Sequence, residues 1–407
     1  MIGLNKEEAK KFVKENGLKT MDDVSGMFKE MHTTIIQAML ESELDDQLGY
    51  QKYDLKSKST SNSRNGNSKK TVRSDYGDLD VQIPRDRKNE FNPIIVKKGS
   101  KDISGLEDKI ISLYAKGMSV RDIESHLQEI YDTDVSSSLI SNITDRIIPE
   151  IKEWQNRPLE KIYPIVYLDG IHYNVRQDGS IVNKAVHIVL GVNIDGKKDV
   201  LGIWISTGGE SSKYWLTVLN ELKNRGVEDI LITCTDNLNG FSEAIKAIYP
   251  KTEIQKCVIH AIRSSTKYLS HKDRKEFCND LKNVYKAPSE DAALTGLADL
   301  DNKWGKKYPL AINVWQNNWC ELSTYYKYPK EVRKIIYTTN AIESFNRKLR
   351  KLTKCKSSFP TDDALLKMLY LATKETVKKW TTSIRDWSLI ISQFSVYFED
   401  RLKDHLY

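Results

Sequence analysis

The chain has 407 residues, long enough for two or more domains, and a formal net charge of +7, a mild basic excess that suits a polyanionic partner without identifying one. It has no apolar run of about eighteen residues and no apolar segment at its N-terminus, so we predict neither a membrane span nor export. The five cysteines are an odd number and widely scattered, which indicates a reducing cytoplasm rather than a disulfide framework.

Residues 6–48 have the apolar spacing of helices. Phe28, Met31, Ile35 and Met39 follow one another in steps of three or four residues, with charged side chains between them. Such a helical segment either packs on the body of the protein or mediates self-association, and the pattern leaves both roles open.

Residues 50–73 are rich in Lys, Arg, Ser, Asn and Gly. They contain too few apolar side chains to offset the entropy of ordering, so this segment by itself is expected to be flexible. Basic segments of this kind often order along a phosphate backbone, and Lys69, Lys70 and Arg73 are candidates for that contact. A solvated linker explains the composition equally well. Residues 76–84 alternate at period two and predict a short edge strand.

Residues 106–149 have the pattern of three short helices. A glycine turn at 116–119 separates the first two, and Ser119 is placed to cap the second. Three such helices form the helix-turn-helix pattern, although trihelical units also occur as plain structural modules. The outer side of the third helix is expected to carry Ser138, Ser141, Asn142, Thr144 and Arg146. If the unit binds DNA, the side chains expected to face the major groove are Ser138, Ser141, Asn142 and Arg146.

Residues 163–170 form an apolar run, rich in β-branched and aromatic residues, that ends on Asp169 and a glycine. Apolar side chains on both faces indicate a central strand covered by helices on both sides. Two Asp-Gly turns follow, at 178–179 and 195–196, and they predict an antiparallel ribbon. Its strand segments are expected at 172–176, 184–194 and 200–205.

A helix at 211–225, a strand at 229–235, a helix at 241–248 and a strand at 253–258 come next. Three antiparallel strands followed by helix, strand, helix and strand make the ribonuclease-H-like layout. In that layout the first and fourth strands are neighbours. These two strands end on Asp169 and Asp236, so we expect the two carboxylates to meet at one edge of an α/β sheet.

The stretch at 263–327 is helical by pattern and rich in aromatic residues, which predicts an all-helical insertion with its own small core. After it, Thr339 or Asn340 can cap a helix whose first turn holds Glu343. The side chains expected to form the buried face of this helix are Ile342, Phe345 and Leu349. The basic residues that follow Glu343 are Arg347, Lys348, Arg350 and Lys351.

Four motifs occur in a fixed order. They are Tyr-Leu-Asp-Gly at 167–170, Cys-Thr-Asp-Asn at 234–237, Lys-Cys-Val-Ile-His at 256–260 and Thr-Thr-Asn-Ala-Ile-Glu-Ser-Phe-Asn-Arg at 338–347. In order and spacing the chain resembles the mutator-type transposases of bacterial insertion sequences over nearly its whole length. The motifs match that family's acidic triad, Cys-x-x-His element and Asn-x-x-Glu-x-x-Asn-Arg helix. The last motif is the most specific, and residues 170–172 depart from the pattern of some relatives.

The resemblance implies that Asp169, Asp236 and Glu343 are the metal-binding catalytic acids of a DDE transposase. The chemistry supports this independently, because two Mg²⁺ ions roughly 3.5–4 Å apart can activate the attacking oxygen and stabilise the leaving oxygen of a phosphodiester. Carboxylates are the ligands that such hard cations prefer. We therefore expect two Mg²⁺ ions per active site, with Mn²⁺ able to substitute.

Other residues of the matching motifs are expected to hold phosphate or to support the acids indirectly: His260, Cys257, Asn340, Asn346 and Arg347. Basic residues further along the same helix are expected to contact DNA: Lys348, Arg350 and Lys351. Zinc is an alternative for the cysteine and histidine, since His271 and Cys278 could complete four ligands, but this spacing is unlike that of common zinc fingers. Simple packing of the pair is a further alternative.

The expected architecture is an α/β catalytic core with an all-α insertion, preceded by a helical DNA-binding region. Its segments are an N-terminal helical segment (1–50), a basic linker with a short β segment (51–100), a helix-turn-helix domain (101–150), a catalytic domain in two parts (151–262 and 335–375), the insertion between them (263–334) and a C-terminal helical tail (376–407).

The sequence is interpreted as a DNA transposase that binds the terminal inverted repeats of its own insertion sequence and catalyses strand cleavage and transfer into target DNA. We expect it to act on nucleoid DNA in the bacterial cytoplasm, as a homodimer or higher homo-oligomer. One alternative is a ribonuclease-H-like, structure-selective nuclease, which would cut without joining ends. The other is an inactive DNA-binding regulator derived from a transposase, against which the three intact acids argue.

Overall fold

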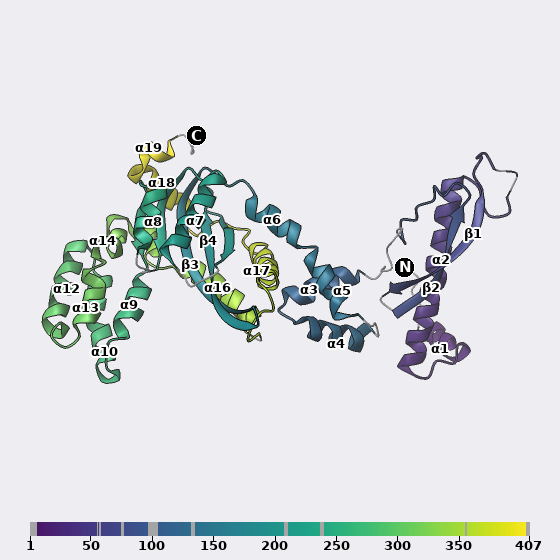
Figure 1. The fold of residues 1–407 in the computed structure, drawn as a ribbon, viewed down its shortest axis with the longest axis horizontal. Helices are drawn as coiled ribbons and strands as arrows, with labels where there is room; N and C mark the ends of the chain where they lie inside the picture. Colours follow the sequence, from purple (N-terminus) through teal and green to yellow (C-terminus); the bar gives the residue numbers. More distant parts are fainter. Residues whose placement is uncertain are drawn as a thin grey trace. The chain divides into compact units, whose positions relative to one another are not determined.

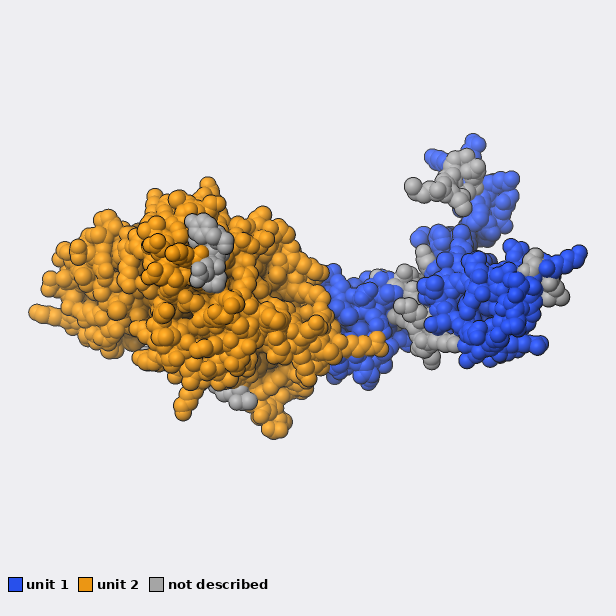
Figure 2. All heavy atoms as spheres, turned by 90° about the horizontal axis from the view of Figure 1, so that it is seen from above, with its two compact units in different colours: residues 1–145 blue, residues 146–407 orange. Residues whose placement is uncertain are grey.

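The computed structural model describes residues 6–54, 56, 58–74, 77–96, 105–131, 135–206, 211–236, 240–354 and 356–403. The chain divides into two compact units, residues 1–145 and 146–407 (Figure 2). Each unit has an apolar core of its own. No helix in the described ranges is long and apolar enough to cross a membrane.

The first unit begins with helices α1 (Lys6–Glu15) and α2 (Met21–Leu48). The start of α2 is stabilised by a capping box in which Thr20 and Asp23 exchange side-chain to backbone hydrogen bonds. The helical prediction for 6–48 is confirmed. Phe28, Met31, Ile35 and Met39 are exposed, whereas the buried side chains are Ile36, Leu40, Leu44 and Leu48.

A β-hairpin covers the buried face of α2. Strands β1 (Arg64–Ser74) and β2 (Gly77–Asp86) pair antiparallel, and their apolar side chains pack with Ile36 and Leu40 of the helix. Flexibility was expected only of the isolated segment; in the chain, residues 64–73 form strand β1, because α2 and β2 supply the apolar area that this basic segment lacks. The predicted strand at 76–84 is present from Gly77, and Tyr76 lies outside the described residues.

Three helices pack together at the end of the first unit: α3 (Leu106–Ala115), α4 (Val120–Tyr131) and α5 (Ser137–Asp145). Gly117, at φ 96°, makes the turn between the first two, and the Ser119 hydroxyl accepts a hydrogen bond from the Asp122 N–H, as the capping prediction required. One expectation is wrong: Thr144 is buried, and its hydroxyl donates to the carbonyl of Ser141.

The second unit contains a five-stranded mixed sheet in the order β5-β4-β3-β6-β7. The strands are β3 (Ile162–Gln177), β4 (Ser180–Val192), β5 (Lys198–Ile205), β6 (Asp229–Thr235) and β7 (Glu253–Lys256). The first three are antiparallel and the last two run parallel to β3, so the first and fourth are neighbours as predicted. Asp178 and Gly179 both have positive φ, as the tightest hairpin turn requires.

Two details of the strand prediction are wrong. Strand β3 does not end at Asp169 but continues unbroken to Gln177, because β4 pairs with it along that whole length. Strand β7 ends at Lys256, two residues early, because helix α9 (Val258–Thr266) begins there.

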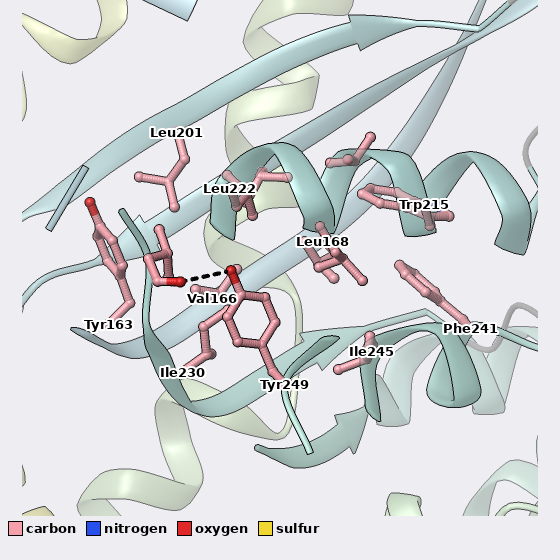
Figure 3. Close-up of a cluster of buried hydrophobic side chains, with 14 of the residues drawn as sticks. Tyr163, Val166, Leu168, Leu201, Trp215, Leu222, Ile230, Phe241, Ile245 and Tyr249 are labelled. Atoms are coloured by element: carbon pink, nitrogen blue, oxygen red, sulfur yellow. Dashed lines mark hydrogen bonds between the residues drawn. The ribbon is translucent and has the colours of Figure 1, made fainter. Parts of the chain in front are cut away.

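Helices cover both faces of the sheet. On one face, α7 (Ser212–Asn224) and α8 (Phe241–Ile248) form the main core with the sheet; Figure 3 shows Trp215 and Leu222 of α7 beside Val166 and Leu168 of β3. On the other face, α16 (Asn340–Thr353) packs against β3 and α17 (Asp362–Val377) against β5. Helix α6 (Ile148–Asn156) joins this layer through its contacts with α17.

Between β7 and α16 the chain is helical, as predicted. After α9 come α10 (His271–Asp280), α11 (Lys282–Tyr285), α12 (Glu290–Trp304), α13 (Pro309–Gln316), α14 (Trp319–Leu322), a 3-10 turn (Thr324–Lys327) and α15 (Lys330–Ile336) (Figure 1). Phe277, Trp304 and Trp315 are buried inside this segment. The chain ends in α18 (Trp387–Tyr397) and α19 (Glu399–Leu402), and Arg401 anchors α19 to Asp229 of β6 by two hydrogen bonds.

Candidate active site

Asp169 lies in β3, and Asp236 directly follows the neighbouring parallel strand β6. The register pairs Tyr167 of β3 with Cys234 of β6. Asp169 follows Tyr167 by two residues, and Asp236 follows Cys234 by two. Because side chains alternate along a strand, Asp169 shares a face of the sheet with Tyr167, as Cys234 does on β6. That face is the one toward α15, since the Tyr167 hydroxyl donates to the Ile335 carbonyl and the Cys234 thiol to that of Ile336. Strand β6 ends at Thr235, so the pair lies where β3 loses its parallel neighbour.

Asp169 is half-buried and held by two donors. Asn346 of α16 donates from Nδ2 to one carboxylate oxygen at 2.7 Å, and the backbone N–H of Gly170 donates to the other at 3.0 Å. Burial and the negative charge of Asp236 together raise the pKa of Asp169 to about 6, against the opposing effects of His260 and the two donors. The two carboxylates therefore repel each other in a partly desolvated site.

Glu343 lies in the first turn of α16, where an acidic side chain is favoured by the helix dipole. The helix forms as its periodicity predicts, with Ile342, Phe345 and Leu349 buried. The Glu343 carboxylate contacts Arg263 of α9 at 3.3 Å and the Nε2 atom of His260 at 3.7 Å.

Cys257 and His260 lie where β7 passes into α9. Cys257 is the residue before the helix, and its N–H donates to the Thr235 carbonyl beside Asp236. Contact with Cys257 raises the pKa of His260 despite burial of the imidazole, and the charges of Asp169 and Asp236 add to that increase. His260 is therefore close enough to interact with all three acids.

The three acids are not equally close. Asp169 and Asp236 are close enough for the charge of Asp236 to raise the pKa of Asp169, whereas the Glu343 carboxylate contacts Arg263 of α9. Within the described ranges, Glu343 instead forms a compact group with Cys257 and His260, whose ligand atoms all lie within 4.8 Å of one another. His271 and Cys278, the other two residues of the zinc alternative, do not belong to that group.

Comparison with known proteins identifies the family. The model of the family described as "Transposase, Mutator family" matches residues 4–383. The chain belongs to the Mutator family of transposases. It is 42% identical over 377 residues to a transposase for insertion sequence element ISRM3 of Rhizobium meliloti (strain 1021), covering 92% of this chain and 93% of the relative. It is also 25% identical to the IS256 transposase in transposon Tn4001 of Staphylococcus aureus, covering 90% and 93% respectively.

Among solved structures, the chain is similar to one from a Drosophila P element transposase strand transfer complex. The identity is 10% and the TM-score 0.38, covering 68% of this chain and 92% of the other. Membership of the Mutator family implies an enzyme that cuts and joins DNA strands and uses a divalent metal.

The remaining motif residues of this Mutator-family chain lie along α16. Asn346 is buried against Asp169, while Asn340 at the helix start and Arg347 one turn after Glu343 are exposed. Further along, Lys348, Arg350 and Lys351 are also exposed. Lys348 is close enough to Lys198 of β5 to lower the pKa of that lysine, in addition to the larger effect of its burial, so cationic side chains from two elements gather here. Asn237 lies outside the described residues.

The candidate DNA contacts on α5, at Arg146 and on β1 are less uniform. On α5, Ser138 and Asn142 are exposed and Ser141 half-buried, while Arg146 is exposed just beyond the helix. On β1, Lys69 and Lys70 are successive residues and therefore point to opposite faces of the hairpin. Lys69 is exposed opposite Gln82, whereas Lys70 is half-buried. Arg73 lies 4.0 Å from Asp78, so its charge is partly compensated.

Two contacts close to Glu343 were missed in the sequence. Arg263 lies one helical turn after His260, so both are on one face of α9. The sequence prediction started this helical stretch only at 263, and the shared face was therefore not noticed. Thr339 was expected to cap α16, but its side chain makes no capping hydrogen bond. Its hydroxyl donates to the Cys257 sulfur at 3.3 Å instead, a contact between residues 82 positions apart that no local pattern signals.

Proposed function

We propose that this Mutator-family transposase binds the terminal inverted repeats of its own insertion sequence, cuts the DNA there and joins the ends to target DNA. Asp169, Asp236 and Glu343 act as its metal-binding acids. The observation that carries the proposal is the closeness of Asp169 and Asp236, whose charge acts on Asp169, with Asp169 hydrogen-bonded to the helix that bears Glu343.

The carboxylate pair fits a divalent metal. Its ligand atoms are hard oxygens, as Mg²⁺ requires, and the raised pKa of Asp169 reflects burial and repulsion by Asp236 that a cation between them would relieve. Two bound Mg²⁺ ions, or Mn²⁺ in their place, would activate the attacking oxygen and stabilise the leaving oxygen. The chain's own residues then orient the reactants: Asn346 holds Asp169, and His260 lies beside all three acids where it can contact phosphate.

The cations on α16 are proposed to hold the DNA backbone. Arg347 follows Glu343 by one helical turn, so its guanidinium can grip a phosphate in bidentate fashion beside the acids. The exposed residues Lys348, Arg350 and Lys351 extend that basic surface, and Asn340 marks its start.

The helix-turn-helix pattern of α3 to α5 is proposed to recognise the terminal repeats. Ser138, Ser141, Asn142 and Arg146 would read bases, and Lys69, Lys70 and Arg73 would contact phosphates. Contacts to bases determine sequence specificity, whereas contacts to phosphates only position the protein on the DNA. Asn142→Ala should therefore reduce the preference for end DNA over random DNA, whereas Lys69→Ala should weaken binding to both alike and reduce its salt dependence.

Because a transposon has two ends, we also propose that the chain works as a homodimer or higher homo-oligomer on DNA. Light scattering of the complex with end DNA gives the number of chains directly. A single chain bound to each end, with no pairing of ends under cleavage conditions, would contradict this part of the proposal.

The decisive experiment incubates the full chain with a duplex carrying its own terminal repeat, then follows cutting and end joining in separate lanes. We expect both activities with Mg²⁺ or Mn²⁺ and neither with EDTA; Ca²⁺ should support binding without cutting, because its looser coordination does not align the attack. Cutting without joining would favour the nuclease, and end binding without cutting the inactive regulator. Full cutting in EDTA would exclude the metal mechanism.

A further inference from the structure

A second group of metal-binding side chains lies beside the carboxylate pair. Cys257, His260 and Glu343 each offer one ligand atom, and these three atoms lie within 4.8 Å of one another. They come from two parts of the fold, the junction of β7 with α9 and the first turn of α16. Neither aspartate of the sheet belongs to this group.

The donor set of this group differs in kind from that of the carboxylate pair. Mg²⁺ binds oxygen, whereas a thiolate together with an imidazole selects a softer ion such as Zn²⁺. A site with three protein ligands, of cysteine, histidine and carboxylate type, leaves the fourth position of tetrahedral zinc open. Such sites exchange ions and water more readily than closed structural sites with four ligands.

The surroundings hold the three ligands in place. The Thr339 hydroxyl donates to the Cys257 sulfur at 3.3 Å, a contact that favours the thiolate which metal binding needs. The Nδ1 atom of His260 is buried without a geometric hydrogen bond to the described residues, and its Nε2 atom lies 3.7 Å from the Glu343 carboxylate. Arg263 pairs with Glu343 at 3.3 Å, but its side chain is 57% exposed and can turn away into solvent.

We propose that Cys257, His260 and Glu343 form a binding site for Zn²⁺ or a similar thiophilic divalent cation. The site shares Glu343 with the catalytic acids. If Glu343 acts as the proposed function requires, an ion in this site withdraws it from the Mg²⁺ centre, and micromolar Zn²⁺ inhibits Mg²⁺-dependent cutting. This consequence rests on the proposed function; the binding itself does not.

Co²⁺ is the probe, because a thiolate ligand gives it a sulfur-to-metal absorption band in the near ultraviolet. We expect the full chain, without DNA or Mg²⁺, to develop that band at one Co²⁺ per chain and to lose it when Zn²⁺ is added. Cys257→Ser should abolish the band. The matched control is Cys320→Ser, which replaces an exposed free thiol in the insertion and should leave the band unchanged.

Two further variants keep the test decisive if Cys257→Ser fails to fold. His260→Gln and Glu343→Gln each retain the thiolate but remove one other ligand, so they should keep the band and raise the Co²⁺ concentration needed to reach it by tenfold or more. A wild-type chain without the band, a band that survives in Cys257→Ser, or unchanged Co²⁺ affinity in both glutamine variants would each overturn the site. Because the titration contains no DNA, loss of the zinc site and failure of the cleavage proposal are separate results.

Discussion

The sheet and the helix hold their acids in different ways. Asp169 is placed by a strand ladder, since it pairs with Ile188 of β4, and Asp236 directly follows β6, which pairs with β3. Glu343 lies in the first turn of α16, and its carboxylate contacts the side chains of His260 and Arg263, of which Arg263 is more than half exposed. A position fixed by a strand ladder is set before any ligand binds, whereas one fixed by exposed side chains can change. We infer that the sheet pair is preformed and Glu343 is adjustable.

The largest expected effect is the loss of DNA cutting, and metal binding then distinguishes two classes of acid, the two aspartates of the sheet and Glu343 of the helix. Asp169→Asn, Asp236→Asn and Glu343→Gln should each abolish cutting while leaving binding to end DNA nearly intact, because they remove metal ligands and not the recognition helices. In the free protein the classes should differ: either asparagine variant should lose Mn²⁺ binding, whereas Glu343→Gln should retain an ion at the sheet pair. Electron paramagnetic resonance of Mn²⁺ measures this directly.

The matched control for this series is Glu331→Gln, which neutralises an acid outside the site and should change neither readout. Retained cutting in any of the three variants would remove that residue from the set of catalytic acids. Equal loss of Mn²⁺ in Glu343→Gln and the asparagine variants would erase the proposed difference between sheet and helix.

A second effect concerns the cation on the helix side. Lysine keeps the charge of Arg347 but loses its planar fork, so Arg347→Lys should bind end DNA normally and position the scissile phosphate poorly. A misplacement of about 1 Å costs roughly a hundredfold in rate. Single-turnover cutting of a pre-bound end measures it, with Arg385→Lys, at another exposed arginine, as control. A wild-type rate in Arg347→Lys would return Arg347 to the solvated surface.

Asn346 joins the two regions, since it lies on the helix and holds the sheet acid. Removing a group that orients a metal ligand typically costs about tenfold to a hundredfold in activity, and we expect that loss for Asn346→Ala. The Asn346 hydrogen bond opposes the rise in the pKa of Asp169. Its removal should therefore move the acidic limb of the pH–rate profile to higher pH.

Ser344→Ala is the control for this variant, because Ser344 is exposed on the same helix. A lower rate with an unmoved acidic limb would mean that Asn346 supports the fold rather than the ionisation of Asp169.

The smallest effect is on stability. Burial and Asp236 raise the pKa of Asp169 from 3.8 to about 6, so the folded chain binds this proton more tightly than the unfolded chain does. Above pH 6 the charged carboxylate therefore lowers the free energy of unfolding by its full amount, and this effect decreases as the pH falls toward the ordinary pKa of the group. Asp169→Asn in EDTA should raise the free energy of unfolding by on the order of 1–3 kcal/mol at neutral pH.

Urea unfolding at several pH values tests the sign. The advantage of Asp169→Asn should be largest above pH 6 and should disappear near pH 4. An advantage that does not vary with pH would show that the charge of Asp169 is not its source.

Much of the catalytic sheet could be predicted from local patterns. Alternating and continuous apolar runs, with Asp-Gly turns between them, predicted the strands, and the match of their order to the ribonuclease-H-like layout made the first and fourth strands neighbours. The helical period at 342, 345 and 349 was enough for the buried face of α16. The individual strands and this buried face could be predicted because each depends on side-chain spacing within one element, which tertiary packing did not override.

Other features depended on partners far away in the chain. The buried face of α2 and the order of β1 follow from their packing on each other, and an apolar stripe alone does not say which side will be covered. Strand β3 extends past Asp169 because β4 supplies a pairing partner there. The group of Cys257, His260 and Glu343 joins a strand end to a helix more than eighty residues later. Its donor atoms meet only after the insertion has folded and returned the chain to the sheet, a closure that no spacing in the sequence encodes.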